Sequence, residues 1–293
     1  MSGERLTGKV AIVTGGGRGL GRAMVLGLAA AGARVVTTSS REAAEVEAVA
    51  REAGSDRVIP MLADVAREED CARVVSGARD RFGRVNILVN NAGRGMKYVS
   101  QRFLTEPTRF WETDPDVWRM VIDTNVNGPF LMARTAVPVM IAAGRGRIVN
   151  ISMNHATMRR RGFSPYEPSK AALESETIIW AQDLEGTGVT VNALLPGCAT
   201  ATGMIPDDLG QEARTGLLDP AVIVPPLLWL ASEASDRVSG RRLDASRWGA
   251  ELKESEAAKA ARGGPLADAR TLGTQGTRRP ELVQDAGGAS RRR

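Results

Sequence analysis

The sequence predicts an α/β fold: one domain built on a doubly wound parallel sheet of about seven strands. Short apolar runs alternate with amphipathic segments along most of the 293 residues. These runs are continuously apolar rather than alternating, which is typical of parallel strands covered by helices on both faces. A glycine-rich turn follows the first run directly, as expected where a first strand passes into a first helix.

Each strand is predicted from an apolar or β-branched run bounded by turn residues. The expected strands are residues 10–13, 34–38, 58–62, 87–89, 147–151, 189–195 and, at an edge, 241–244. Each helix is predicted from apolar residues at helical spacing. The expected helices are residues 24–33, 41–51, 66–82, 117–140, 166–184 and 221–231. Right-handed crossovers should join the parallel strands.

The turn after the first strand reads Thr14-Gly15-Gly16-Gly17-Arg18-Gly19-Leu20-Gly21. Glycines allow the backbone to turn sharply and to approach a bound group, while the N–H groups of the following helix point at that group. A diphosphate is the natural ligand for such a turn. A closely packed turn without a ligand is the alternative.

The segment between Gly93 and Val117 has no periodicity and carries Phe103, Phe110 and Trp111. A loop this long inside one domain is usually functional. We expect it to form one wall of a substrate pocket, with packing of its aromatic residues on the surface as the alternative.

Composition excludes several classes of protein. No apolar run approaches the roughly 20 residues that span a bilayer, and the N-terminus lacks the apolar stretch of a signal peptide, so a soluble cytoplasmic protein without a membrane partner is expected. Cys71, Cys198 and the single histidine, His155, give no metal-ligand pattern. No metal site is therefore expected.

The net charge is +5, and the segment from Gly249 to Arg293 contributes +3 of it through nine Lys/Arg and six Asp/Glu. Because this segment has few large apolar side chains, we expect a disordered basic tail after a domain that spans residues 1–248. Nucleic-acid binding by the tail is an alternative, but solubility is the simpler use of its charge, so no nucleic-acid partner is expected.

Tyr166 and Lys170 lie four residues apart on one predicted helix and therefore share a face. Lowering the pKa of a tyrosine from about 10 to about 7 requires roughly 4 kcal/mol. One ammonium about 4 Å away supplies roughly that amount at an effective dielectric constant of 20. Such a tyrosine could transfer a proton at neutral pH. A chance pair on a helix surface is the alternative.

Together, these residues resemble the short-chain dehydrogenase/reductase family. The resemblance spans roughly Leu6 to Trp248. It is carried by motifs in the family's order and spacing: Thr14 to Gly21, Asp64-Val65, Asn90-Asn91-Ala92-Gly93, Asn125, Tyr166 with Lys170, and Pro196-Gly197. The family implies a Rossmann-type fold, an NAD(P) cofactor and hydride transfer between an alcohol and a carbonyl.

The resemblance also implies roles for single residues. Tyr166 would be the general acid/base, Lys170 would bind the nicotinamide ribose and lower the tyrosine pKa, and Asn125 would bend its helix and hold a relay water. The remaining cofactor-binding residues would be Gly15, Arg18, Gly19, Leu20, Gly21, Ser40, Arg41, Asp64, Val65, Asn91, Ala92, Gly93, Pro196, Gly197 and Thr202. Simpler structural uses compete, such as a helix cap for Asp64 and a plain turn at Pro196-Gly197.

The end of the second strand decides which cofactor is preferred. NAD enzymes usually place an acidic residue there for the adenosine ribose. This chain has Ser39-Ser40 followed by Arg41, and Arg18 in the glycine loop. Two guanidinium groups suit a 2'-phosphate, so NADP is favoured over NAD.

The chain departs from the family at one position. Met153 stands where the family has the serine that hydrogen-bonds the reacting carbonyl, thirteen residues before Tyr166. Adjacent side chains of a strand point to opposite faces, so Ser152 could replace that serine only if the strand ends in a bulge or twist. Asn154 is the alternative donor, and His155 could line the same pocket.

These observations predict an NADP-dependent oxidoreductase that acts on a small carbonyl or alcohol substrate. A cofactor-binding protein with little catalysis, serving as a sensor or assembly partner, is the alternative that Met153 favours. The family resemblance further implies a homodimer or homotetramer built through the helices that carry Asn125 and Tyr166.

Overall fold

The computed structural model describes residues 5–156, 158–206, 209–249 and 251–262. Its centre is a seven-stranded sheet in the order β3-β2-β1-β4-β5-β6-β7, and every named pair of neighbouring strands is parallel. This arrangement confirms the predicted Rossmann-type fold. The strands are β1 Val10–Val13, β2 Arg34–Ser39, β3 Val58–Leu62, β4 Ile87–Asn90, β5 Gly146–Ile151, β6 Val189–Leu195 and β7 Arg241–Asp244.

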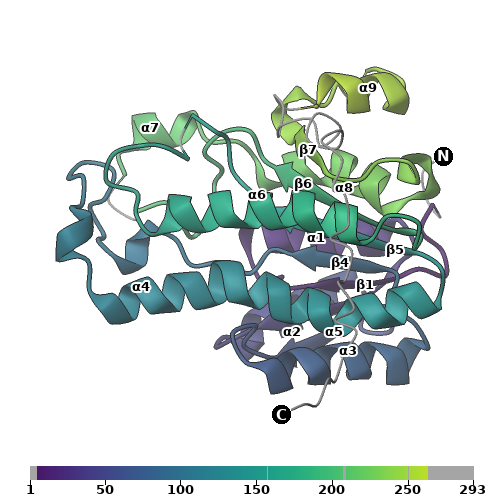
Figure 1. The fold of residues 1–293 in the computed structure, drawn as a ribbon. Coiled ribbons are helices and arrows are strands. Elements are labelled where there is room, and N and C mark those ends of the chain that lie inside the picture. The colour runs from purple at the N-terminus through teal and green to yellow at the C-terminus, as the bar shows by residue number, and fades with distance from the viewer. Residues whose placement is uncertain (1–4, 157, 207–208, 250, 263–293) are drawn as a thin grey trace, which may run out of the picture.

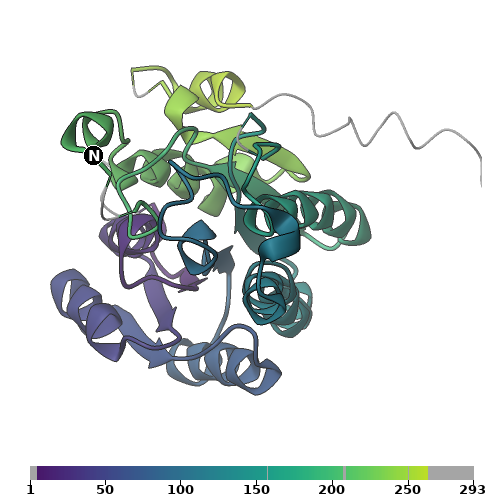
Figure 2. The same cartoon turned by 90° about the vertical axis from the view of Figure 1, so that its left-hand side faces the viewer.

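The helices cover both faces of the sheet (Figures 1 and 2). They are α1 Gly19–Ala30, α2 Ala43–Ala53, α3 Glu68–Phe82, α4 Pro115–Ile122, α5 Gly128–Ala142, α6 Tyr166–Asp183, α7 Gln211–Thr215, α8 Val224–Ala231 and α9 Glu254–Ala260. Alternate residues of β1 enter two separate cores: Ala11 and Val13 pack with α1 and α8, and Val10 and Ile12 pack with α3 and α5. This two-sided burial is why the strands read as continuous apolar runs.

The order of the strands reverses between β1 and β4. The chain builds the sheet outward from β1 to β3 and then returns to β4 on the other side of β1. In sheets of this kind, ligands bind beyond the carboxyl ends of the strands at such a reversal. The glycine loop follows β1, and Asn91 follows β4, so both lie at this point.

The single helix expected at residues 117–140 is in fact two helices. A π-helical turn, Asp123–Asn127, separates α4 from α5, and Asn125 lies within it. Such turns widen the helix by one residue per turn and are frequent at functional sites. Periodicity alone did not reveal the interruption, because apolar spacing continues on both sides of it.

The expectation of a disordered tail from Gly249 is wrong for residues 251–262. Helix α9 forms there, with Ala257 and Ala258 buried against the domain. The backbone N–H of Asp244 donates to Ala261 O at 2.7 Å, and Leu243 pairs antiparallel with Arg262. Small alanine side chains allow this close packing although they offer little apolar surface. The rest of the expected tail, residues 263–293, lies outside the described residues.

No helix in the described part of the chain combines the length and apolarity that crossing a membrane requires.

Candidate active site

The glycine loop packs tightly against the end of β4. Gly15 adopts φ +66°, and a Cβ added to it would lie 2.9 Å from Ala92 Cα. A Cβ on Gly21 would lie 2.1 Å from Gly15 O and 2.6 Å from Asn91 Nδ2. A side chain at Gly15 would push the loop away from Ala92, and one at Gly21 would push α1 away from the loop, so the sequence needs glycine at both.

Thr14 and Asn91 join the ends of β1 and β4. Thr14 Oγ1 accepts hydrogen bonds from the backbone N–H groups of Asn91 and Ala92, both at 3.0 Å. Asn91 Nδ2 donates to Thr14 O at 2.8 Å and to Gly15 O at 2.9 Å. These bonds occupy the Asn91 side chain, so its contribution to a cofactor site is to hold the glycine loop in shape.

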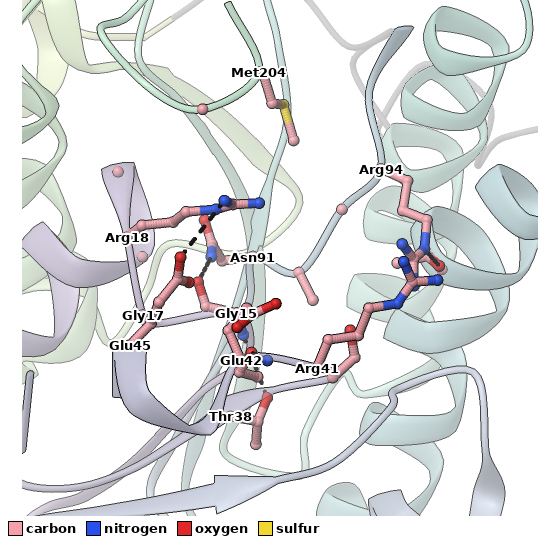
Figure 3. A pocket seen from close by; sticks show the side chains of 18 of the residues that line it. Gly15, Gly17, Arg18, Thr38, Arg41, Glu42, Glu45, Asn91, Arg94 and Met204 are labelled. Atoms are coloured by element: carbon pink, nitrogen blue, oxygen red, sulfur yellow. Dashed lines mark hydrogen bonds and ion pairs between the residues drawn. The ribbon is translucent and has the colours of Figure 1, made fainter. Parts of the chain in front are cut away.

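A cleft of about 350 Å³ opens beside this loop (Figure 3). Thirteen of the predicted cofactor-binding residues line it: Gly15, Arg18 to Gly21, Ser40, Arg41, Asp64, Val65, Asn91 to Gly93 and Thr202. The first residues of α1 lie at the cleft, and Arg18, at the helix N-cap, makes no capping side-chain bond to any described residue. The N-terminal N–H groups of α1 are thus available to an anion.

Sequence reasoning missed several residues of the cleft. Glu45 lies 3.5 Å from the Arg18 guanidinium, and Arg94, Lys97, Tyr98 and Met204 also line the cleft. Arg94 follows the Asn90 to Gly93 motif directly, which is the only signal in the sequence that could have placed it. Glu45 could have been found from helical spacing, because it lies on the first turn of α2.

Arg94 is buried and connects the cleft to α4 and α5. Its Nε donates to Thr124 Oγ1 at 3.1 Å, and its Nη1 donates to the Tyr98 hydroxyl at 2.9 Å. The guanidinium also lies 5.0 Å from the centre of the Tyr98 ring. These contacts fix the start of the loop that was predicted to form a pocket wall.

Asp64 takes part in local turn structure as well as lining the cleft. Its carboxylate accepts from the Ala66 backbone N–H at 3.1 Å, and its own N–H donates to the Asp70 carboxylate at 2.8 Å. Asp64 therefore accepts a local cap-like hydrogen bond, as the structural alternative expected, and it also lines the cleft. The two roles are compatible.

Asn125 is completely buried and connects the cleft to α6. Its Nδ2 donates to Arg94 O at 3.0 Å and to Ser169 Oγ at 2.9 Å, and its Oδ1 accepts from the Arg94 N–H at 2.8 Å. Ser169 lies between Tyr166 and Lys170 on α6. Asn125 therefore sets the position of the Tyr166 helix relative to the loop that follows β4.

Tyr166 and Lys170 lie side by side at the start of α6. Lys170 Nζ is 5.9 Å from the centre of the Tyr166 ring and donates to Ile151 O at 2.9 Å. The Tyr166 hydroxyl contacts Met204 Sδ at 3.9 Å. Neither Tyr166 nor Lys170 lines the cleft itself, which Met204 does.

The expected lowering of the Tyr166 pKa is wrong for this structure. Burial, together with the charge of the Glu167 carboxylate, raises the Tyr166 pKa to about 12. Burial lowers the pKa of Lys170 to about 8, while the charge of Glu174 acts in the opposite direction. The phenol stays protonated because the ammonium is directed at the Ile151 carbonyl and burial outweighs its attraction.

Ser152 does not take the place of the family's serine in this structure. Its side chain is buried, and Oγ donates to the Glu174 carboxylate. The backbone N–H of Ser152 continues the β5 ladder by donating to Leu194 O at 2.9 Å, so the strand does not bulge before this residue. Strand alternation therefore turns Ser152 into the protein interior. Asn154 Nδ2, the alternative donor, bonds Gly197 O at 2.8 Å.

Pro196 and Gly197, also predicted to bind cofactor, do not line the cleft. Gly197 has φ +101°, and a Cβ added to it would lie 2.1 Å from Ser246 Oγ. The turn packs against the residues that follow β7, which explains the need for glycine there. No described group of three or more His, Cys, Asp or Glu side chains could hold a metal ion.

The parallel sheet, the glycine loop at its reversal and the anion-ready N-terminus of α1 define a dinucleotide-binding α/β protein. Comparison with known proteins gives the family: the short chain dehydrogenase model matches residues 9–212, and the chain belongs to this family. It is an NAD(P)-dependent oxidoreductase of the class that acts on alcohol and carbonyl groups.

Individual relatives differ in substrate. The chain is 34% identical over 194 residues to a 3-oxoacyl-[acyl-carrier-protein] reductase of Synechocystis, covering 66% of this chain and 74% of that protein. It is 34% identical over 244 residues to a 3-alpha-(or 20-beta)-hydroxysteroid dehydrogenase of Mycobacterium bovis, covering 82% and 88%. The 3-ketoacyl-(acyl-carrier-protein) reductase of Brucella melitensis, solved with NADH, aligns with a TM-score of 0.72 at 31% identity, covering 82% and 97%.

Proposed function

We propose that this protein reduces a carbonyl compound to an alcohol, with Tyr166 as the proton donor, Lys170 as its partner and NADP(H) as the preferred cofactor. The observation that carries the proposal is the Asn125 contact with both Arg94 and Ser169, which fixes the Tyr166 helix next to the cleft. The glycine cradle at Gly15 and Gly21 and the free N-terminus of α1 fit a diphosphate.

A bound nicotinamide supplies or accepts the hydride. The chain supplies the proton: a phenol whose pKa is raised to about 12 is protonated at neutral pH and can donate to a substrate oxygen. The ammonium of Lys170 would then oppose the negative charge left on the phenol. This state of Tyr166 favours reduction over oxidation at neutral pH.

NADP is favoured by the cations at the end of β2. Arg41 and Arg18 both line the cleft, and guanidinium groups bind phosphate through charged, directional hydrogen bonds. Glu45 pairs with Arg18 in this structure and offsets part of its charge. We therefore assign the larger share of 2'-phosphate binding to Arg41.

Tyr166→Phe tests the proposed reaction. It should leave dinucleotide binding nearly unchanged, because Met204 is the only described cleft residue that the phenol hydroxyl hydrogen-bonds. It should lower turnover by about 100-fold or more, which is typical of the loss of a general acid. Tyr98→Phe removes the only other tyrosine hydroxyl. Since Tyr98 belongs to the cleft, this variant should change KM or cofactor affinity more than kcat. Turnover that survives in Tyr166→Phe would reject the assigned role.

The second candidate, a cofactor-binding protein with little catalysis, is favoured by one observation. Met153 occupies the position of the family's serine, and the Ser152 hydroxyl is bound to Glu174. NADPH consumption across a panel of aliphatic, aromatic and steroid carbonyls separates the two candidates. Dinucleotide binding without hydride transfer to any of these compounds would select the second.

We also propose that the protein forms a homodimer or homotetramer through α4, α5 and α6. Large apolar side chains are exposed on all three helices: Trp118, Phe130, Ile141 and Ile179. Phe130, on α5, is 47% exposed and Ile179, on α6, is 52% exposed. Light scattering of the intact chain and of Phe130→Glu tests this, since an interface of this kind should lose its association when a charge is introduced.

A further inference from the structure

A buried carboxylate, Glu174, accepts hydrogen bonds from three donors in two other parts of the fold. It lies on α6, one turn after Lys170, and its side chain is 4% exposed. It accepts hydrogen bonds from Ser152 Oγ, from Arg242 Nε at 2.9 Å on β7, and from His155 Nε2 at 2.8 Å. A carboxylate buried this deeply is stable only with such partners.

Further contacts hold the segment 152–155, which follows β5. Arg242 Nη2 donates to Met153 O at 2.6 Å, and Asn154 Nδ2 donates to Gly197 O at 2.8 Å. Just before the segment, Lys170 donates to Ile151 O. Helix α6 therefore holds this segment from both ends, through Lys170 at residue 151 and through Glu174 at Ser152 and His155.

We propose that Glu174 is a positioning residue for the reaction: its carboxylate fixes Ser152 and His155 against α6 and acts as the counter-charge of the Lys170 ammonium. The hydrogen bonds of the Glu174 carboxylate support its role in fixing Ser152 and His155. Helical spacing supports its role as counter-charge, because Lys170 and Glu174 are four residues apart and share a face of α6. It rests on the proposed function only where it concerns turnover.

The charges around these two groups set the expected direction. Glu174 is faced by Arg242 from β7, by His155 from the loop after β5 and by Lys170 from its own helix, and Lys170 is faced by Tyr166 and Glu174. Burial lowers the Lys170 pKa to about 8, and Glu174 opposes this change. Removing the carboxylate charge should therefore lower the Lys170 pKa further.

The test measures the Lys170 ammonium directly. The chain has only five lysines, Lys9, Lys97, Lys170, Lys253 and Lys259, so ¹³C-lysine NMR of the full chain can follow each one, with Lys170→Arg for assignment. In Glu174→Gln the Lys170 titration should move about one pH unit lower or more, as for the loss of a nearby opposite charge. Glu176→Gln is the control: Glu176 lies on the same helix, and its Oε2 has no hydrogen-bond partner among the described residues. This variant should leave the Lys170 titration unchanged.

Glu174→Gln removes the carboxylate that neutralises the buried Arg242, so this variant could fail to fold. Glu174→Gln/Arg242→Met removes both ions and keeps the test decisive. In this double variant the Lys170 titration should still lie below that of the unaltered protein. A Lys170 titration that matches the unaltered protein in the double variant would overturn the counter-charge role.

Turnover gives a second, separate readout. If Lys170 must be charged, a lower Lys170 pKa moves the alkaline limb of the kcat/KM profile to lower pH in the double variant. A role limited to structure would lower kcat/KM equally at every pH, and that result contradicts the proposal. Absence of turnover in the unaltered protein with every carbonyl tested defeats the proposed function instead, and the NMR titration still decides the role of Glu174.

Discussion

The thioether of Met204 lies 3.9 Å from the Tyr166 hydroxyl, and Met204 also lines the dinucleotide cleft. A Cβ added to Gly95 would lie 3.4 Å from Met204 Sδ, and one added to Gly93 would lie 3.7 Å from its Cε. Met204 thus lies close to Gly93 and Gly95 after β4 and contacts the phenol. Figure 3 shows its side chain directed into the pocket. If Tyr166 is the proton donor, as proposed, the substrate shares this space with Met204.

Met204→Ala should shift substrate preference toward bulky carbonyl compounds. Shortening the side chain opens the space beside the Tyr166 hydroxyl, and a few methylene-sized groups are worth about 10-fold or more in kcat/KM. The ratio of kcat/KM for a bulky ketone to that for a small one measures the effect. Met61→Ala, on β3 and far from Tyr166 in the strand order, serves as the control and should leave the ratio unchanged. An unchanged ratio in Met204→Ala would contradict the prediction.

Arg41→Ala should weaken NADPH binding far more than NADH binding. The 2'-phosphate is the only group that differs between the two, and the loss of one charged hydrogen bond costs about 1.5–3 kcal/mol, or roughly 10-fold or more in Kd. Calorimetric titration with both cofactors gives the two values. Arg102→Ala removes an arginine that pairs with Glu106 outside the cleft and should affect neither. An equal loss of affinity for NADPH and NADH would mean that Arg41 does not bind the 2'-phosphate.

Gly15→Ala should destabilise the fold and abolish cofactor binding together. Gly15 has φ +66°, and its added Cβ would meet Ala92 Cα at 2.9 Å. Gly144→Ala is the matched control, because Gly144 has φ +67° but nothing lies within 4 Å of its added Cβ. The control should cost about 1–2 kcal/mol of unfolding free energy from backbone strain alone. Urea unfolding and NADPH titration compare the two variants, and equal effects would show that the contact with Ala92 is unimportant.

Glu167 should make stability fall as pH rises. Burial raises its pKa from 4.5 to about 7, while the Arg160 backbone N–H and charge lower it in part. The folded state therefore holds a proton that the unfolded state releases, so stability is lost as pH rises from about 4.5 through about 7. The melting temperature of Glu167→Gln should exceed that of the unaltered protein increasingly over this range. The exposed Glu185→Gln should show a constant difference, and a constant difference in Glu167→Gln would reject the prediction.

Much of the fold and of the cofactor cleft could be predicted from the sequence. The strands 10–13 and 189–195 match β1 and β6 at both ends, because a strand buried on both faces must be apolar almost throughout and turn residues limit its length. The glycines of the first loop are equally informative, since positions such as Gly15 and Gly21 admit no side chain. These features depend on residues that are close together in the sequence, so the sequence predicts them directly.

The parts that sequence reasoning missed depend on contacts between distant segments. The direction of the Ser152 side chain follows from the register of β5 on β6 and from Glu174, 22 residues later. The Tyr166 pKa depends on its burial and on the Glu167 charge, which the spacing of Tyr166 and Lys170 on one helix does not reveal. Met204 reaches Tyr166 from 38 residues further along the chain. No pattern near either residue predicts that contact.

The pairing of Leu243 with Arg262 also bears on how the β7 edge of the sheet resists the addition of a strand from another molecule. Strand β7 is outermost in the sheet, and such a strand offers unpaired backbone groups on which a strand of another molecule can add. The return of the chain at Ala261 and Arg262 occupies part of that row. Residues 251–262 thus cover part of this edge and hinder the addition of a strand from another molecule. We expect a chain shortened to Trp248 to aggregate more readily.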